Sequence, residues 1–215
     1  MVLLPPCFIV GVRWQTYKSG AEFLRLFNPS YQGDYCRDLY RVYFGKAPQL
    51  RVLGNAFGEN VVKTWLSIQL RDFSEFCGNK DKLRAQQISQ LADVIALNFG
   101  YLSATEFMHF LQQFKAGRFG RFYGSVDALT ITCALRDFEA IRSEEKARLT
   151  QEAERREEEE AERQHDEEVR RFRELLKRYG ITANEYLLLK DVLDGQHTDA
   201  EIAEATKRIR QRHKR

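Results

Sequence analysis

Apolar residues recur at helical spacing along two stretches of the chain, residues 59–77 and 81–99. They are Val62, Trp65, Leu66, Phe73 and Phe76 in the first stretch and Ile88, Leu91, Ala92, Ile95 and Phe99 in the second. Spacings of three, four and seven place such residues on one face of a helix. The pattern therefore predicts two amphipathic helices, which Gly78-Asn79 and Gly100 are expected to end.

Capping residues mark the next two helices. Ser103 and Glu106 have the spacing of a capping box, in which each side chain bonds the backbone N–H of the other residue. Asp127 is expected to cap the helix that follows. The apolar faces are Phe107, Phe110, Leu111 and Phe114 in the first helix and Ala128, Ile131, Leu135 and Phe138 in the second. We expect one hydrophobic core that includes Trp65, Phe107, Leu111, Phe114, Ile131, Leu135 and Phe138.

The region before these helices has weaker signals. Asp34 is expected to cap a short helix that runs through Tyr43 and ends at Gly45. Further upstream, residues 8–12 predict either a short strand packed on the domain or an extension outside it. The apolar start of the chain lacks a basic region and is interrupted by Pro5-Pro6, so it does not have the pattern of a signal peptide.

A long charged stretch follows the core helices. Residues 141–179 contain neither Gly nor Pro, and between Leu149 and Val169 the apolar residues are Ala153 and Ala161. A coiled coil needs a sustained apolar seam, which this stretch lacks. Pairs of Glu and Arg four apart contribute on the order of 1–2 kcal/mol together. They are Glu144/Arg148, Glu152/Arg156, Glu159/Arg163, Glu167/Arg171 and Glu174/Arg178. We therefore expect residues 143–170 to form a solvent-exposed helical spacer with few tertiary contacts.

Gly180 is expected to end the spacer. Two capping boxes, Thr182 with Glu185 and Thr198 with Glu201, then predict two short helices. Two short helices bury little surface, so we expect them to dock on the end of the spacer or on a partner. The spacer residues available for docking are Phe172, Leu175 and Leu176.

The predicted fold is all-α. We expect an N-terminal extension or strand over residues 1–20, a compact helical domain over 21–140, the charged helical spacer over 141–178, and a small helical unit with a basic tail over 179–215. The hydrophobic fraction of 43% supplies a core and excludes wholesale disorder. No apolar run approaches the roughly 18–20 residues of a membrane helix, so no membrane partner is expected.

The sequence offers little catalytic chemistry. The four cysteines contain no C-x-x-C pair, which excludes a paired zinc site and is typical of a reduced, cytoplasmic protein. None of the four histidines has metal-binding spacing, and there is no phosphate-binding P-loop and no nucleophile elbow. We therefore expect no enzyme activity, no metal and no cofactor.

The turn from Lys115 to Gly124 is the main candidate for binding. Its cations are Lys115, Arg118 and Arg121, and its aromatic residues are Phe119, Phe122 and Tyr123. Cations can contact phosphates and exposed rings can stack on bases, although the same residues suit a protein partner or a tight corner whose rings pack inward. The next acid in sequence is Asp127. We therefore expect the three cations to point outward uncompensated, while Phe119 and Phe122 pack inward.

The C-terminal tail is a second candidate. Its last eleven residues contain six Lys or Arg and no acid. Such a tail favours an anionic partner, but it is equally typical of a solvated terminus. The candidate binding residues are Lys115, Arg118, Arg121 and Tyr123 in the turn and Arg208, Arg210 and Arg212 in the tail.

Residues 48–142 resemble a family of uncharacterised helical proteins associated with bacterial mobile elements. The resemblance depends on Trp65 to Asp72, on Glu75 to Gly78 and on Thr105 to Asp127. Relatives have Pro after that Asp, where this chain has Ala128. The family brings no established activity. More distantly, the turn and the succession of domain, charged helix and terminal unit are similar to phage replicative-helicase loaders.

These observations lead to two hypotheses of different class. The first is a non-enzymatic accessory protein of DNA replication or of a mobile element, whose domain contacts DNA or a replication protein through the turn. Its C-terminal unit would engage a second protein, such as a hexameric replicative helicase. The alternative is a structural or regulatory interaction module without a nucleic-acid role. A nuclease or other enzyme ranks third, and the oligomeric state stays open.

Overall fold

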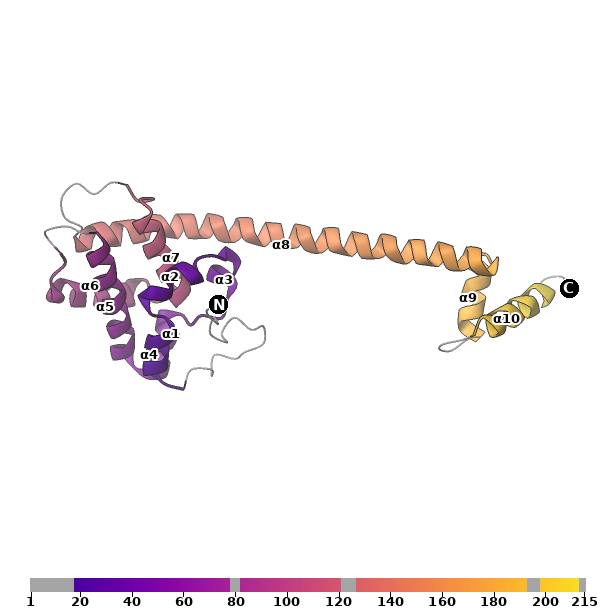
Figure 1. The fold of residues 1–215 in the computed structure, drawn as a ribbon, viewed down its shortest axis with the longest axis horizontal. Helices are drawn as coiled ribbons and strands as arrows, with labels where there is room; N and C mark the ends of the chain where they lie inside the picture. The colour runs from indigo at the N-terminus through magenta and orange to yellow at the C-terminus, as the bar shows by residue number, and fades with distance from the viewer. Residues whose placement is uncertain (1–17, 78–81, 121–126, 193–197, 213–215) are drawn as a thin grey trace. The chain divides into compact units, whose positions relative to one another are not determined.

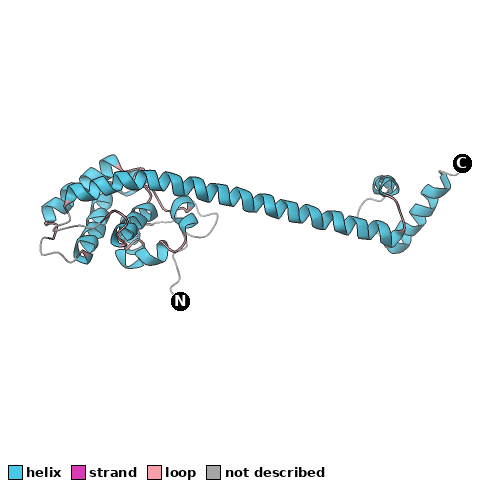
Figure 2. Ribbon diagram, turned by 90° about the horizontal axis from the view of Figure 1, so that it is seen from above, coloured by secondary structure: helices cyan, strands magenta, loops and turns pink. Residues whose placement is uncertain are grey.

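The computed structural model describes residues 18–77, 82–120, 127–192 and 198–212, and these residues are organised as helices without a strand. The predicted all-α fold is therefore confirmed (Figure 2). The chain divides into two compact units, unit 1 (Met1–Leu149) and unit 2 (Thr150–Arg215). The boundaries predicted at residues 20, 140 and 178 stay predictions. No helix among the described residues is long and apolar enough to cross a membrane.

Unit 1 begins with short helical segments, which Figure 1 shows in indigo. They are α1 (Gly20–Leu26), the 3-10 helix η3 (Pro29–Tyr31), α2 (Gln32–Tyr35), α3 (Leu39–Phe44) and α4 (Leu50–Phe57). Two longer helices follow, α5 (Glu59–Phe76) and α6 (Ala85–Asn98). Gly58, between α4 and α5, has a φ of 90°, which a residue with a side chain rarely adopts. This glycine lets α4 fold back directly against α5.

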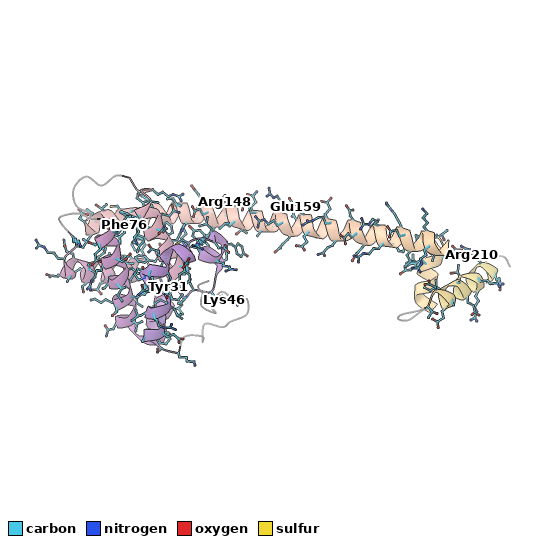
Figure 3. The ribbon with its side chains drawn as sticks, viewed as in Figure 1. Tyr31, Lys46, Phe76, Arg148, Glu159 and Arg210 are labelled. Carbon is cyan, nitrogen blue, oxygen red and sulfur yellow. The ribbon has the colours of Figure 1, made fainter. Side chains whose placement is uncertain are left out.

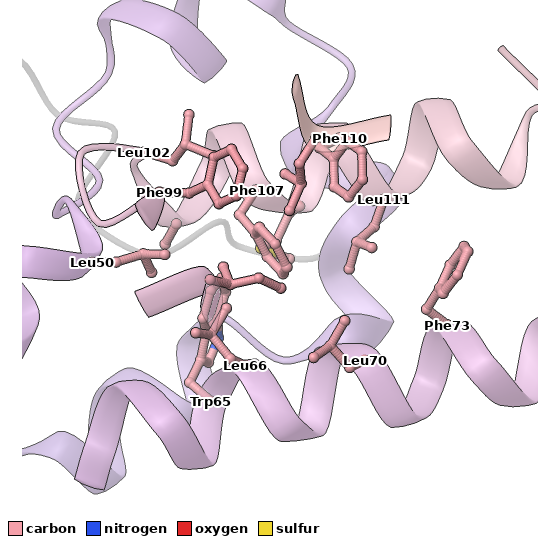
Figure 4. Packing of buried hydrophobic residues seen from close by; sticks show 14 of the residues in the cluster. Leu50, Trp65, Leu66, Leu70, Phe73, Phe99, Leu102, Phe107, Phe110 and Leu111 are labelled. Atoms are coloured by element: carbon pink, nitrogen blue, oxygen red, sulfur yellow. The ribbon is translucent and has the colours of Figure 1, made fainter. Parts of the chain in front are cut away.

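Helix α7 (Ala104–Lys115) lies at the centre of unit 1 and packs against α2, α3 and α5. Figure 4 shows Trp65, Leu66 and Leu70 of α5 facing Phe107 and Leu111 of α7. The Trp65 indole N–H donates to the Phe27 carbonyl at 2.8 Å, so this large ring is buried without leaving its polar atom unpaired. All seven core residues expected from the sequence belong to this one cluster.

Helix α8 (Ala128–Tyr179) begins in unit 1, where Ile131, Leu135 and Phe138 are fully buried. Its later residues are mostly exposed, and Figure 3 shows their side chains standing away from the helix, with Glu159 labelled. The expectation of few tertiary contacts over 143–170 is wrong for the first turns. Glu145 and Lys146 contact α3 or α7, and Leu149 packs against the core.

Unit 2 contains the rest of α8, α9 (Ala183–Val192) and α10 (Asp199–Arg212). Gly180 has a φ of 60° and ends α8, and the Thr182–Glu185 capping box closes with bonds of 2.8 and 3.2 Å. The Phe172 ring meets the Tyr186 ring edge-on at 5.0 Å. The predicted contact between the end of the charged helix and the first short helix is therefore confirmed for Phe172.

Two local expectations were wrong. Asp34 caps no helix through Tyr43, because α2 ends at Tyr35 and Asp38 caps α3 by accepting from the Arg41 N–H at 3.2 Å. Phe76 does not join the core: it is the last residue of α5 and is 60% exposed, with the Lys115 ammonium group over its ring. Gly100 directly follows the C-cap residue Phe99, which agrees with its expected place at the end of α6, and a Cβ there would lie 2.7 Å from the Ala96 carbonyl oxygen. The strand predicted over residues 8–12 lies outside the described residues.

Candidate functional site

The turn after α7 starts with a glycine that the backbone requires. Gly117 has a φ of 82°, and its N–H donates to the Phe114 carbonyl at 2.9 Å. The Arg118 N–H donates to the Gln113 carbonyl at 3.1 Å, which completes a Schellman motif. This motif turns the chain back so that the Phe119 ring packs 5.4 Å from Phe110. The inward position expected for Phe119 is confirmed, whereas Arg121, Phe122 and Tyr123 lie outside the described residues.

Lys115 does not point outward as an uncompensated cation, and that expectation was wrong. Its Nζ donates to Asp72 Oδ2 at 2.7 Å and to Gln32 Oε1 at 2.9 Å, and it lies 5.5 Å from the centre of the Phe76 ring. The side chain is only 16% exposed. Asp72 comes from α5, so helix packing supplies a counterion that is remote in sequence.

Arg118 is compensated in the same way. Its guanidinium donates to Glu145 Oε1 at 2.9 Å and to Gln113 Oε1 at 3.1 Å. Glu145 lies on α8, 27 residues away in sequence. The two described cations of the turn are therefore each held by a carboxylate from another helix, and a phosphate would have to compete with these carboxylates for them.

Glu145 is the centre of a polar group that we call the Glu145 cluster, made with Tyr43, His109 and Arg118. The Tyr43 hydroxyl donates to Glu145 Oε2, and His109 Nε2 lies 3.6 Å from the same oxygen. Burial pushes the pKa of Glu145 upward, but the hydrogen bonds from Tyr43 and Arg118 outweigh it and hold the pKa below its ordinary value. The cluster therefore joins α3, α7, the turn and α8 around one ionised carboxylate.

His109 is almost completely buried, with 2% of its surface exposed. Burial lowers its pKa, although the nearby Glu145 carboxylate acts in the opposite direction. Its Nδ1 atom has no hydrogen-bond partner among the described residues. The imidazole is therefore neutral at pH 7, and its contact with Glu145 is not an ion pair under that condition.

Glu106 forms a second buried anionic centre. Its carboxylate accepts from the Ser103 N–H at 2.8 Å, as the capping box predicted, and also from Arg142 Nε at 2.8 Å. Lys146 Nζ lies 3.6 Å away. One side chain thus caps α7 and neutralises part of the charge of two cations on α8.

Two of the three candidate residues of the tail, Arg208 and Arg210, are also in contact with acids. Arg210 Nε donates to Glu185 Oε1 at 2.9 Å, and Arg210 also bonds the Gly180 carbonyl. The bond from Arg210, followed by that from the Thr182 N–H, lowers the pKa of Glu185 to about 2. Arg208 pairs with Glu204 at 2.6 Å but stays 75% exposed. Arg212 ends α10, and its side chain lies outside the described residues.

Sequence reasoning did not find the partners that organise this site. Asp72, Tyr43 and His109 stand in different helices, and nothing in their spacing links them to the turn. Glu145 follows another glutamate, Glu144, and many more acids occur along the same charged stretch. Nothing in its sequence context therefore distinguishes it from its solvated neighbours. Over the described ranges, no three His, Cys, Asp or Glu side chains are grouped so that they could hold a metal ion.

The fold and the site together define an all-α protein of two helical units, with cations and carboxylates paired between helices. A family model with the description "Family of unknown function (DUF6633)" matches residues 82–192. The chain belongs to this family, and the match extends from α6 to α9. No curated protein and no solved structure matches the chain.

Proposed function

We propose that this protein is a non-enzymatic accessory factor that joins two macromolecules, one bound by unit 1 and one by unit 2. The observation that carries the proposal is the thin core of unit 2. Among its described side chains, Ile181 and Thr206 are buried, whereas Leu187 is 59% exposed. A unit with so little buried apolar surface gains stability when a partner covers it.

The partner of unit 2 is a protein of DNA replication, and a hexameric replicative helicase is the specific candidate. The support for this partner is the likeness of the turn, and of the order of folded domain, charged helix and terminal unit, to phage helicase loaders. The resemblance to proteins of bacterial mobile elements supports the same setting. In this setting the exposed Arg208 side chain contributes to an electrostatic contact with the partner or with DNA.

A module without any nucleic-acid role is the second candidate. Lys115 pairs with Asp72 and Arg118 pairs with Glu145, which favours this candidate. With both cations neutralised, a partner would recognise the shape of the turn and not its positive charge. In this version the turn, with its inward Phe119, supports the surface of unit 1 and does not contact phosphates.

The test is affinity capture from the native host with the full chain as bait. Leu187→Asp places a charge on an exposed apolar position of unit 2, and Leu97→Asp makes the same change on α6 of unit 1, where Leu97 is 83% exposed. We expect the full chain to capture a replicative helicase, Leu187→Asp to lose it, and Leu97→Asp to keep it. Capture that is equally strong with both variants, or a partner unrelated to replication, would contradict the proposal.

A further inference from the structure

Aromatic rings and cations lie together where α3 and the start of α7 meet α8. Lys146 Nζ lies 5.4 Å from the centre of the Phe44 ring, and the Arg142 guanidinium lies 5.6 Å from the centre of the Tyr101 ring. Arg142 and Lys146 are four residues apart, so they occupy successive turns on one side of α8. Two cation–π pairs therefore stand side by side on unit 1.

The residues after α3 bring two more cations to this surface, Lys46 before α4 and Arg51 in the first turn of α4. The Ala104 N–H donates to the Pro48 carbonyl at 3.0 Å, and the Arg51 N–H donates to the Gly100 carbonyl at 2.8 Å. Residues 46–51 thus run beside residues 100–104. We call the resulting surface the aromatic–basic face, and its members are Tyr40, Phe44, Lys46, Arg51, Tyr101, Arg142 and Lys146 (Lys46 is labelled in Figure 3).

This face carries an excess of positive charge, unlike the turn after α7. Its four cations are opposed by Glu106, which contacts Arg142 and Lys146, and by Glu139, which accepts from the Tyr101 hydroxyl. Lys46 and Arg51 are exposed and have no ion-pair partner among the described residues. Two cations thus remain available for an anionic ligand without displacing a carboxylate.

The rings of the face are accessible to a ligand. Phe44 is 39% exposed, and its ring lies 5.0 Å from that of Tyr40, which is 52% exposed. Exposed rings next to cations match a ligand with both flat apolar groups and regularly spaced negative charges. Single-stranded DNA has this chemistry, because its unpaired bases can stack on the rings while its phosphates meet the cations. In duplex DNA the faces of the bases are already stacked on one another.

We propose that the aromatic–basic face of unit 1 binds single-stranded DNA, with bases stacked on Phe44 and Tyr40 and phosphates held by Lys46 and Arg51. This inference builds on the proposed role in DNA replication and assigns the DNA contact to a surface other than the turn. The turn keeps its cations paired with Asp72 and Glu145.

The experiment measures binding of the full chain to a fluorescein-labelled oligo-dT by anisotropy across a salt series. Phe44→Leu removes the stacking ring but keeps an apolar side chain, and it should weaken binding about fivefold or more. The double variant Lys46→Ala/Arg51→Ala should lower the salt slope by about 1.4, since each phosphate contact to a single strand contributes about 0.7.

Matched variants elsewhere on unit 1 serve as controls. Phe76→Leu changes another exposed ring that lies beneath a lysine, and Arg71→Ala/Lys82→Ala removes two cations that lie outside the face. Both controls should leave affinity and slope unchanged. Equal losses in face and control variants, equally tight binding of duplex DNA, or binding of poly-glutamate without DNA would overturn the proposal.

The capture experiment separates the two proposals. The variant Phe44→Leu should capture the replication partner as well as the unmodified chain does. A chain that captures its partner but binds no oligo-dT would overturn the DNA-binding face and leave the proposed function standing. A chain that binds oligo-dT through the face but captures no replication protein would overturn the proposed function and leave the DNA-binding face standing.

Discussion

Helix α7 and the stretch of α8 from residue 150 to 171 have the same backbone conformation for opposite reasons. In α7 the buried side chains cover all sides of the helix and include Thr105, Glu106 and His109. Along residues 150–171 nearly every side chain is exposed. Burial against the core holds α7 in place, whereas helix propensity and charge pairs between neighbouring turns hold the exposed stretch.

The comparison extends to the charges. Of the pairs expected along the spacer, Glu167 and Arg171 meet at 3.3 Å, while Glu159 pairs with Arg155 at 3.6 Å. These side chains are more than half exposed, so solvent screens them and each pair contributes a few tenths of a kcal/mol. Glu106 is 3% exposed and faces two cations. The same kinds of charge pair therefore contribute little to stability along the exposed stretch of α8 and much more at Glu106 of α7.

The largest effect is expected from a cavity beside α7. Phe107 is fully buried and its ring lies 5.7 Å from that of Trp65. Phe107→Ala should lower the free energy of unfolding by about 3–5 kcal/mol. Urea denaturation measures it, with Leu97→Ala at an exposed position as a control that should change stability by less than about 0.5 kcal/mol. A loss below about 1 kcal/mol for Phe107→Ala would mean that α7 is not held by burial.

A smaller loss is expected from removing the charge of Glu106. Glu106→Gln keeps a side chain that can cap α7 but loses the ionic contacts with Arg142 and Lys146. It should cost about 1.5–3 kcal/mol, as for a buried hydrogen bond to a charged group. Glu160→Gln on the exposed stretch is the matched change and should stay within about 0.5 kcal/mol. Equal effects of the two variants would remove the distinction between the helices.

The third prediction concerns the dependence of stability on pH. Burial lowers the pKa of His109 below its ordinary value of 6.5, so the unfolded chain binds this proton more readily than the folded protein. The resulting stability is therefore present at pH 7 and is lost as the pH falls below about 6.5. Glu145 has a pKa held below its ordinary 4.5, so its contribution is retained throughout this window.

The measurement is the free energy of unfolding at pH 7 and at pH 5. The unmodified chain should lose more stability over this interval than His109→Gln, which cannot take up the proton. The groups that face His109 are Tyr43, Glu106, Arg118 and Glu145. They are the same in both proteins, so the difference between the two proteins isolates the histidine. Parallel pH profiles for the two proteins would show that His109 is not protonated on unfolding.

The smallest effect concerns the exposed stretch by itself. A peptide of residues 150–171 should be substantially helical and monomeric, and its helicity should fall as salt screens the Glu–Arg pairs. Circular dichroism across salt and peptide concentrations measures both properties. Helicity that rises with peptide concentration would indicate self-association, and it would favour a scaffold in which this stretch dimerises.

Much of the fold follows from local chemistry. The capping boxes at Ser103 and Thr182 and the stop glycine at position 180 were all predicted, because each acts on residues within a few positions of itself. The core cluster also follows from sequence, since a helical stripe of large apolar side chains must be covered by another such stripe. These helix ends and the membership of the main core are in this sense properties of the sequence alone, whereas the cap expected at Asp34 and the burial expected for Phe76 were not found.

The electrostatics of the candidate site were decided by the tertiary structure. Lys115 and Arg118 have no acid close to them in sequence, yet packing brings Asp72 of α5 and Glu145 of α8 within 2.7 and 2.9 Å. The aromatic–basic face arises in the same way, because α3 and the start of α7 meet on α8. By itself the sequence determined where most of the longer helices begin, end and bury their apolar sides, since those are short-range effects. Which charges are neutralised and which stay available depends on contacts between distant residues, and only the packing of the helices decides them.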